Sequence, residues 1–344
     1  MISSIPSSVD EIMRNSDKPP LLEIQNLVVE YPTLDGNVRA VDNVSLTIDK
    51  GEVLGLVGES GCGKSTLGYS ILGLLQGGVI RSGRILYNKK DLVQLSEEEM
   101  EKLRGSDISM VFQASQNALN PLQKVSDHFI DTLKVHELWT EEKWEEVKSL
   151  LHRLEIPPTR LKDNPFQFSG GMQQRIVIAL TLILNPKMII ADEPTTALDV
   201  LVQARLLQLL KDIIREYKLT VIYITHDLGV VAEITNRVAI MYAGQIVEVG
   251  DTFTIFESPA HPYTQALIKA IPNVKEKEKK QLSFIPGHPP DLRNPPKGCS
   301  FADRCTFVKD VCRKESPELI MIGSKSQHIA KCLMFHESYE SHFR

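Results

Sequence analysis

The chain has 344 residues, of which 42% are hydrophobic and 24% are charged, and its formal net charge is −5. This is the composition of a globular protein with a full core, and the lack of excess positive charge excludes nucleic acid as the main partner. The most apolar run, residues 176–184, is too short to cross a bilayer, and the N-terminus lacks a basic region followed by an apolar one. We therefore expect a cytosolic protein, in which five cysteines favour metal binding over disulfides.

Residues 1–20 are rich in Ser, Pro, Asp and Asn, which predicts a mobile extension. Residues 21–31 and 41–49 then alternate between apolar and polar side chains around the turn at residues 34–37, and this predicts an antiparallel hairpin. Tyr31 ends the first strand, where an exposed aromatic ring could stack on a purine. Packing at the strand end is the commoner role for such a residue.

The stretch Gly58-Glu-Ser-Gly-Cys-Gly-Lys-Ser-Thr66 fits the pattern G-x-x-x-x-G-K-S/T and follows an apolar run. Its glycines let backbone N–H groups turn around phosphate oxygens, and a helix starting near Lys64 adds the positive end of its dipole. Lys64 would reach the β- and γ-phosphates, and Ser65 would hold Mg²⁺. The alternative is a glycine-rich turn with a surface lysine. The predicted nucleotide-binding residues are Gly58, Glu59, Ser60, Gly61, Cys62, Gly63, Lys64, Ser65 and Thr66.

The helix from Lys64 is expected to reach residue 75, and strands are expected at residues 83–88 and 108–112, the second ending at Gln113. From about residue 114 to 180 the periodicity is helical, with one apolar stripe over residues 144–154. Ser169 can cap the last of these helices. Gly170 and Gly171 at its N-terminus leave N–H groups open to an anion, although for Ser-Gly-Gly alone a capped loop is the favoured interpretation.

Residues 187–192 are apolar on both faces, as in a buried parallel strand, and they end at Asp192 and Glu193. Parallel sheets place ligand chemistry at this end of their strands. Asp192 would bind Mg²⁺, usually through water, and Glu193 would orient or deprotonate the attacking water. After a helix at residues 200–217, a second buried strand at residues 219–225 is followed by His226. A lone histidine is usually structural, but its position at the same sheet edge favours a functional role.

A hairpin over residues 237–249 closes this part of the chain, and the charged run at residues 275–280 marks a linker. Beyond it, four cysteines lie in a Pro-rich segment with little apolar core, which requires a cross-link. Their spacing, C-x5-C-x6-C-x19-C, lacks the C-x2-C pairs of zinc ribbons and leaves zinc and an iron–sulfur cluster open. Disulfides are the weakest of the three options. The candidate ligands are Cys299, Cys305, Cys312 and Cys332.

Several candidate motifs follow one another along the chain: the phosphate loop, Gln113, Ser169-Gly170-Gly171, Asp192-Glu193, Leu198-Asp199 and His226. In this order they resemble the motifs of ABC transporter ATPase subunits, and the resemblance covers residues 21–270. The resemblance implies adenine stacking on Tyr31, a signature at residues 168–172, a Walker B strand at 187–193, a D-loop at 196–199 and a switch histidine at His226. The signature has Phe168 and Met172 where leucine and glutamine are usual, but its Ser-Gly-Gly is intact. The implied catalytic residues are Glu193, His226, Gln113 and Asp199, with Ser65, Gln113 and Asp192 serving Mg²⁺.

The segments His261-Pro-Tyr-Thr264 and Gly298-Cys-Ser-Phe-Ala-Asp-Arg-Cys305 resemble the C-terminal region of dipeptide and oligopeptide permease ATP-binding subunits. In that subfamily the four tail cysteines can carry a 4Fe–4S cluster. The implied activity is ATP hydrolysis that powers peptide uptake. The implied partners are a second ATP-binding subunit, two transmembrane permease subunits and an extracytoplasmic solute-binding protein. The two ATP-binding subunits are expected to form a heterodimer, and a homodimer is the alternative.

The resemblance implies an α/β P-loop ATPase at the cytoplasmic face of the cell membrane. It would have a mostly parallel core sheet, an N-terminal antiparallel β part, a helical subdomain and a small Cys-rich C-terminal extension. The expected divisions are a flexible extension (1–20), an ATPase domain (21–270) with the helical subdomain (114–180), a linker (271–283) and the Cys-rich extension (284–344). Two alternatives stay open: another solute, such as an oligosaccharide or nickel, and a nucleotide-binding regulatory partner with little turnover.

Overall fold

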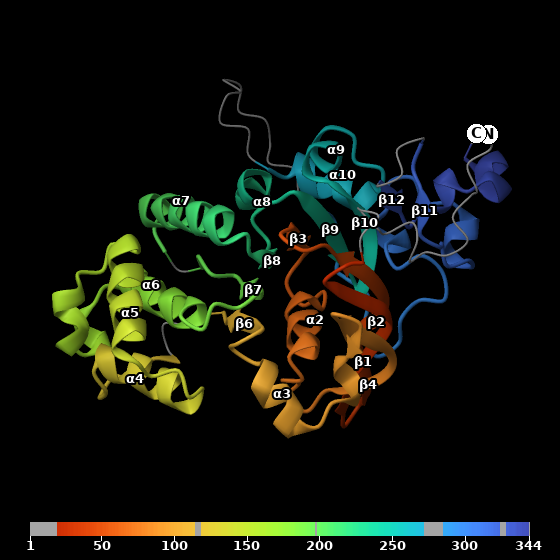
Figure 1. The fold of residues 1–344 in the computed structure, drawn as a ribbon. Helices are drawn as coiled ribbons and strands as arrows, with labels where there is room; N and C mark the ends of the chain where they lie inside the picture. The colour runs from red at the N-terminus through yellow and green to blue at the C-terminus, as the bar shows by residue number, and fades with distance from the viewer. Residues whose placement is uncertain (1–18, 114–117, 197, 272–284, 324–327, 344) are drawn as a thin grey trace, which may run out of the picture. The chain divides into compact units, whose positions relative to one another are not determined.

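The computed structural model describes residues 19–113, 118–196, 198–271, 285–323 and 328–343 (Figure 1). The chain forms two compact units, the first made of Met1–Leu95 with Thr225–Arg344 and the second of Ser96–Ile224. Most of the expected N-terminal extension and of the charged linker lies outside the described residues. Within the described ranges, no helix combines the length and apolar character that a membrane span requires.

The first unit contains a four-stranded antiparallel sheet with the order β2-β1-β4-β5. Its strands are β1 (Leu22–Thr33), β2 (Gly36–Ile48), β4 (Val79–Tyr87) and β5 (Lys90–Asp91). The predicted hairpin of β1 and β2 is confirmed, and its strands run closer to the turn than expected, because Thr33 pairs directly with Gly36. Alternate side chains of β1 are buried, which explains the alternation seen in the sequence.

The first unit also contains five strands that are hydrogen-bonded side by side in the order β11-β12-β10-β9-β3. β3 (Val53–Val57) is parallel to β9 (Arg237–Tyr242), and β9 and β10 (Gln245–Asp251) form the predicted antiparallel closing hairpin. Two short strands that were not predicted, β12 (Ile329–Ala330) and β11 (Ile320–Met321), add to the edge of β10. The C-terminal residues therefore extend a sheet of the first unit, whereas the predicted boundary of a separate extension remains a prediction.

Short helices complete the first unit. Helix α2 is shorter than predicted, since it ends at Ile71. The helices are α2 (Lys64–Ile71), η1 (Leu92–Gln94), α8 (Leu228–Ile234), α9 (Thr252–Glu257), α10 (Pro262–Lys269), η5 (Ala302–Arg304), η6 (Asp310–Arg313), η7 (Leu333–Phe335) and η8 (Glu337–His342).

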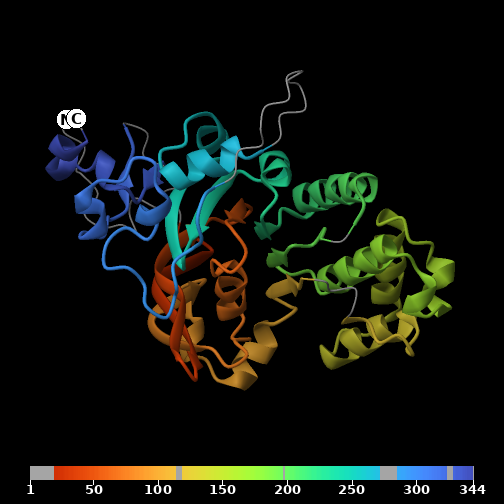
Figure 2. The same cartoon turned by 180° about the vertical axis from the view of Figure 1, so that it is seen from behind.

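The second unit contains three parallel strands in the order β8-β7-β6, and every residue of each is buried, as predicted for parallel strands. They are β6 (Ile108–Val111), β7 (Met188–Asp192) and β8 (Thr220–Thr225). Helices α4, α5 and α6 lie together in both views (Figures 1 and 2). The helices are α3 (Glu97–Leu103), α4 (Val125–Val135), α5 (Glu141–Arg153), η3 (Pro158–Lys162), η4 (Pro165–Gln167), α6 (Gly170–Leu182) and α7 (Val200–Tyr217).

Candidate functional site

The candidate phosphate loop joins β3 to α2, which is the strand–loop–helix arrangement that the sequence predicted. Glycine is required at two of its positions by close approach of other backbone. A Cβ atom on Gly58 would lie 2.1 Å from the carbonyl oxygen of Met241, and one on Gly63 would lie 2.1 Å from that of Ala40. Gly63 also has a φ of 105°, which L side chains rarely adopt. The loop is therefore held close to its neighbours in a shape that only these glycines allow.

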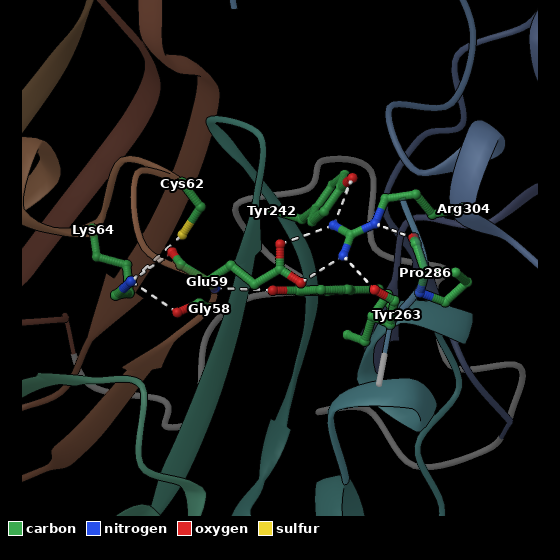
Figure 3. Close-up of polar contacts among 9 residues, drawn as sticks. Gly58, Glu59, Cys62, Lys64, Tyr242, Tyr263, Pro286 and Arg304 are labelled. Carbon is green, nitrogen blue, oxygen red and sulfur yellow. Dashed lines mark hydrogen bonds and ion pairs between the residues drawn. The ribbon is translucent and has the colours of Figure 1, made fainter. Parts of the chain in front are cut away.

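Lys64 occupies the inside of this loop. Its side chain is buried, and its Nζ atom donates hydrogen bonds to the carbonyl oxygens of Gly58 at 2.8 Å and Glu59 at 2.9 Å (Figure 3). Helix α2 begins at Lys64 without a side-chain cap from Gly63, so its first N–H groups point toward the loop. Cys62 is buried beside Lys64, and burial raises the pKa of its thiol. The loop thus gathers a lysine ammonium and a helix N-terminus, which together suit an anion.

Glu59 is contacted by the side chains of Tyr263 and Arg304, and Arg304 also donates a hydrogen bond to the Tyr242 hydroxyl. None of these three side chains was assigned a role from the sequence. The only sequence signal for them is that Tyr263 and Arg304 lie inside the two C-terminal motifs quoted above.

The acidic candidate residues, Asp192 and Glu193, lie in the second unit. Asp192 ends β7 and is fully buried, and the next residue, Glu193, has a φ of 47°. A carboxylate oxygen of Glu193 accepts hydrogen bonds from the Gln113 side chain at 3.0 Å and from the Thr196 hydroxyl at 2.9 Å. A left-handed backbone at a non-glycine residue costs about 1–3 kcal/mol and is often found at functional sites. The structure therefore brings Gln113 and Glu193 together and fixes the carboxylate by two donors.

The Ser-Gly-Gly segment lies at the start of α6. The Ser169 hydroxyl accepts a hydrogen bond from the Met172 N–H at 3.4 Å, so the predicted cap is confirmed. Ser169 and Gly170 are exposed, whereas a Cβ atom on Gly171 would lie 2.6 Å from the Val202 side chain. This helix N-terminus is therefore exposed at Ser169 and Gly170, and a phosphate contact there remains a prediction.

Phe168, where leucine is usual, is buried beneath the guanidinium group of Arg160, which lies 4.1 Å from the ring centre. The larger side chain is thus accommodated without exposing an apolar ring. Phe168 therefore departs from the usual leucine without altering Ser169 and Gly170, the exposed residues of the signature.

The three remaining predicted site residues, Tyr31, Asp199 and His226, lie in different surroundings. The Tyr31 ring lies against Gly78, on which a Cβ atom would be 2.9 Å from the ring. The carboxylate of Asp199 accepts a hydrogen bond from the Val202 N–H at 3.0 Å and so caps α7. His226 directly follows β8 and is exposed. Adenine stacking and the two catalytic roles remain predictions.

The candidate Mg²⁺ ligands offer the oxygen atoms that this cation prefers, namely the hydroxyl of Ser65, the amide oxygen of Gln113 and the carboxylate of Asp192. Ser65 belongs to the first compact unit, and the other two belong to the second. The chemistry of the set fits Mg²⁺, and the assignment remains a prediction.

The four tail cysteines are free thiols that line one small cavity, together with Phe301 and Leu333. Burial raises the pKa of Cys299 to about 11 and that of Cys332 to about 12, so metal binding would have to displace their protons. Within the described part of the chain, no three His, Cys, Asp or Glu side chains are arranged to hold a metal ion. The 4Fe–4S cluster and its zinc alternative therefore remain predictions. The cavity is lined by Cys299, Cys305, Cys312 and Cys332.

Two family models match this chain. Residues 41–196 match the model described as ABC transporter, and residues 247–312 match the model described as oligopeptide/dipeptide transporter, C-terminal region. The chain is 44% identical over 321 residues to the oligopeptide transport ATP-binding protein OppD of Bacillus subtilis, covering 92% of this chain and 89% of that protein. It is 48% identical over 302 residues to the dipeptide transport ATP-binding protein DppD of the same organism, covering 86% and 90%.

Solved structures of ABC transporter cassettes are similar to this fold. A bacterial ABC transporter cassette, solved as a dimer, is 30% identical and matches 67% of this chain and 98% of its own with a TM-score of 0.60. The cbiO1 protein of Clostridium perfringens, part of the ABC transporter complex cbiONQ, is 30% identical and matches 70% and 92% with a TM-score of 0.61. With the mixed α/β fold and the phosphate loop, these matches lead to one conclusion: the chain belongs to the ATP-binding proteins of the ABC transporter family.

Proposed function

We propose that this ABC ATPase powers the uptake of dipeptides or oligopeptides at the cytoplasmic face of the cell membrane. The observation that carries the proposal is the match of residues 247–312 to the C-terminal region of oligopeptide/dipeptide transporters. Relatives that are 44% and 48% identical are named oligopeptide and dipeptide transport ATP-binding proteins, which supports the same substrate class.

The roles of the residues follow from their chemistry. Lys64 and the N–H groups at the start of α2 neutralise phosphate charge, and Tyr31 stacks on adenine. Glu193, oriented by Gln113 and Thr196, positions the attacking water, and His226 contacts the γ-phosphate. Bound Mg²⁺ contributes further neutralisation of the phosphates.

A second ATP-binding subunit completes each site in this proposal. Ser169 and Gly170 are exposed at a helix N-terminus, and a similar bacterial cassette was solved as a dimer. The Ser-Gly-Gly segment of one subunit would face the phosphate loop of the other, and ATP would favour the closed dimer because it binds both surfaces. A heterodimer with two permease subunits and a solute-binding protein is the proposed assembly.

Peptide uptake by cells tests the proposed substrate class. Cells that lack the gene should lose uptake of a labelled tripeptide and recover it with the wild-type chain but not with Lys64→Ala. Uptake of nickel and of an oligosaccharide should be unchanged in the same cells. Loss of nickel or oligosaccharide uptake with normal peptide uptake would contradict the proposal.

The tail cysteines carry a separate proposal, a structural 4Fe–4S cluster. Its support is that Cys299, Cys305, Cys312 and Cys332 line one cavity and that none forms a disulfide. Protein purified without oxygen should contain about four irons per chain and show visible absorption that a reductant bleaches. One zinc per chain without that absorption would refute the cluster.

A further inference from the structure

Arg304 from the C-terminal region reaches the phosphate loop. Its guanidinium group donates two parallel hydrogen bonds to the Glu59 carboxylate, at 2.8 and 2.9 Å (Figure 3). It also donates to the carbonyl oxygen of Pro286 at 2.9 Å and to the Tyr242 hydroxyl at 3.2 Å. The Arg304 side chain is 5% exposed and that of Glu59 is 26% exposed. Such a paired, mostly buried fork fixes the direction of the carboxylate.

The backbone of Glu59 is held from the same side. Its N–H group donates a hydrogen bond to the Tyr263 hydroxyl at 2.9 Å, and burial raises the pKa of Tyr263, which keeps this hydroxyl neutral. The Tyr263 ring packs against Tyr242 and Phe301, with ring centres 4.6 and 5.4 Å apart. Both Tyr263 and Arg304 lie within residues 247–312, the segment that matches the peptide-transporter C-terminal region. This segment therefore contacts one residue of the phosphate loop, Glu59, at both its backbone and its side chain.

These contacts of Glu59 have two expected physical effects on nucleotide binding. The carbonyl oxygen of Glu59 accepts a hydrogen bond from Lys64, so a shift of Glu59 would also move a partner of the lysine. The Glu59 carboxylate lies in a loop that must accept a polyanion, and Arg304 cancels its negative charge. Without Arg304, Glu59 would be free to move and its charge would repel phosphate.

We propose that Arg304 is a positioning residue for ATP: acting through Glu59, it holds the phosphate loop in its binding shape and neutralises the one carboxylate there. The inference rests on the proposed role of residues 58–66 in binding nucleotide. Arg304 ends the short helix η5, and the adjacent Cys305 packs against the apolar cluster that contains Tyr242, Tyr263 and Phe301. Arg304 thus links the fold of the Cys-rich tail to the phosphate loop.

The test compares ATP hydrolysis by the assembled transporter with Arg304→Gln and with the double variant Arg304→Gln/Glu59→Gln. Arg304→Gln should raise KM for MgATP about tenfold while kcat changes less than about twofold, the pattern of a lost binding interaction. The double variant should recover most of the lost affinity, because the unpaired carboxylate is gone. The matched control is Arg313→Gln, which removes an exposed tail arginine paired with Asp303 and should leave KM unchanged.

An unchanged KM in Arg304→Gln would overturn the inference. A double variant as weak as the single one would also overturn it, because a merely structural arginine is not rescued by removing a charge. Should Arg304→Gln not fold, Arg304→Lys carries the test: it lacks the fork and should raise KM about threefold, and a wild-type KM would refute the inference. Lys64→Ala distinguishes failure of this inference from failure of the proposed nucleotide-binding role of residues 58–66. Normal MgATP binding by that variant would refute the proposed role of the loop itself.

Discussion

His261 makes the stability of the first unit sensitive to acid. It precedes α10, is 1% exposed, and its Nδ1 atom accepts a hydrogen bond from the Tyr263 N–H at 3.1 Å. Burial lowers its pKa from 6.5 to about 4; the charge of Glu248 opposes this shift, and that of Lys331 adds to it. His261 is therefore neutral in the folded protein at pH values where an exposed histidine is already charged.

The sign and size of the effect follow from proton binding. Between about pH 6.5 and pH 4 the unfolded chain binds a proton at this histidine that the folded chain does not, so stability falls as the pH falls. At about 1.4 kcal/mol per pKa unit, the full loss is about 3 kcal/mol, of which about 2 kcal/mol is reached by pH 5. The contribution is fully present above the unfolded pKa.

The assay is urea unfolding of the wild type and of His261→Asn at pH 7 and at pH 5. Asparagine keeps an acceptor at the helix start and does not titrate. The wild type should lose about 2 kcal/mol more than the variant between these two pH values, because all other groups titrate alike in both proteins. Equal losses in the two proteins would refute the assignment of this acid sensitivity to His261.

Two further predictions concern the first unit. Gly63→Ala should weaken MgATP binding at least tenfold and destabilise the fold by about 1–3 kcal/mol, because the φ of 105° and the Ala40 carbonyl oxygen at 2.1 Å exclude a side chain; a wild-type dissociation constant in an ATP titration would contradict this. Arg237→Met should lower the free energy of unfolding by about 3–5 kcal/mol, because it leaves the buried Glu52 carboxylate without the guanidinium 3.2 Å away. Arg313→Gln, at an exposed pair, should cost less than about 1 kcal/mol in the same urea experiment, and equal losses would contradict the reasoning.

The strands and the phosphate loop were predictable because their signals are local. The fully buried strands β6, β7 and β8 appear in the sequence as apolar runs, and the alternation of β1 is visible on either side of the register shift between Ile24 and Leu27. Ser169 could be assigned to a helix cap because the glycines and the helical run follow directly.

The contacts within the site could not be predicted in the same way. Gln113 and Glu193 are 80 residues apart, and Glu59 and Arg304 are 245 residues apart, so no periodicity relates them. Strand β12 has two residues, which is too short to show alternation. The spacing of the cysteines likewise says nothing of the shared cavity, because the fold alone brings Cys299 and Cys332 together.

The central claim is that this chain binds ATP at residues 58–66 and hydrolyses it with Glu193. The most direct measurement compares MgATP binding and single-turnover hydrolysis for the wild type and for Glu193→Gln in the assembled transporter. The variant is expected to bind MgATP as tightly as the wild type and to lose nearly all turnover, because the amide cannot serve as the oriented carboxylate. Near-normal hydrolysis by Glu193→Gln would contradict the claim.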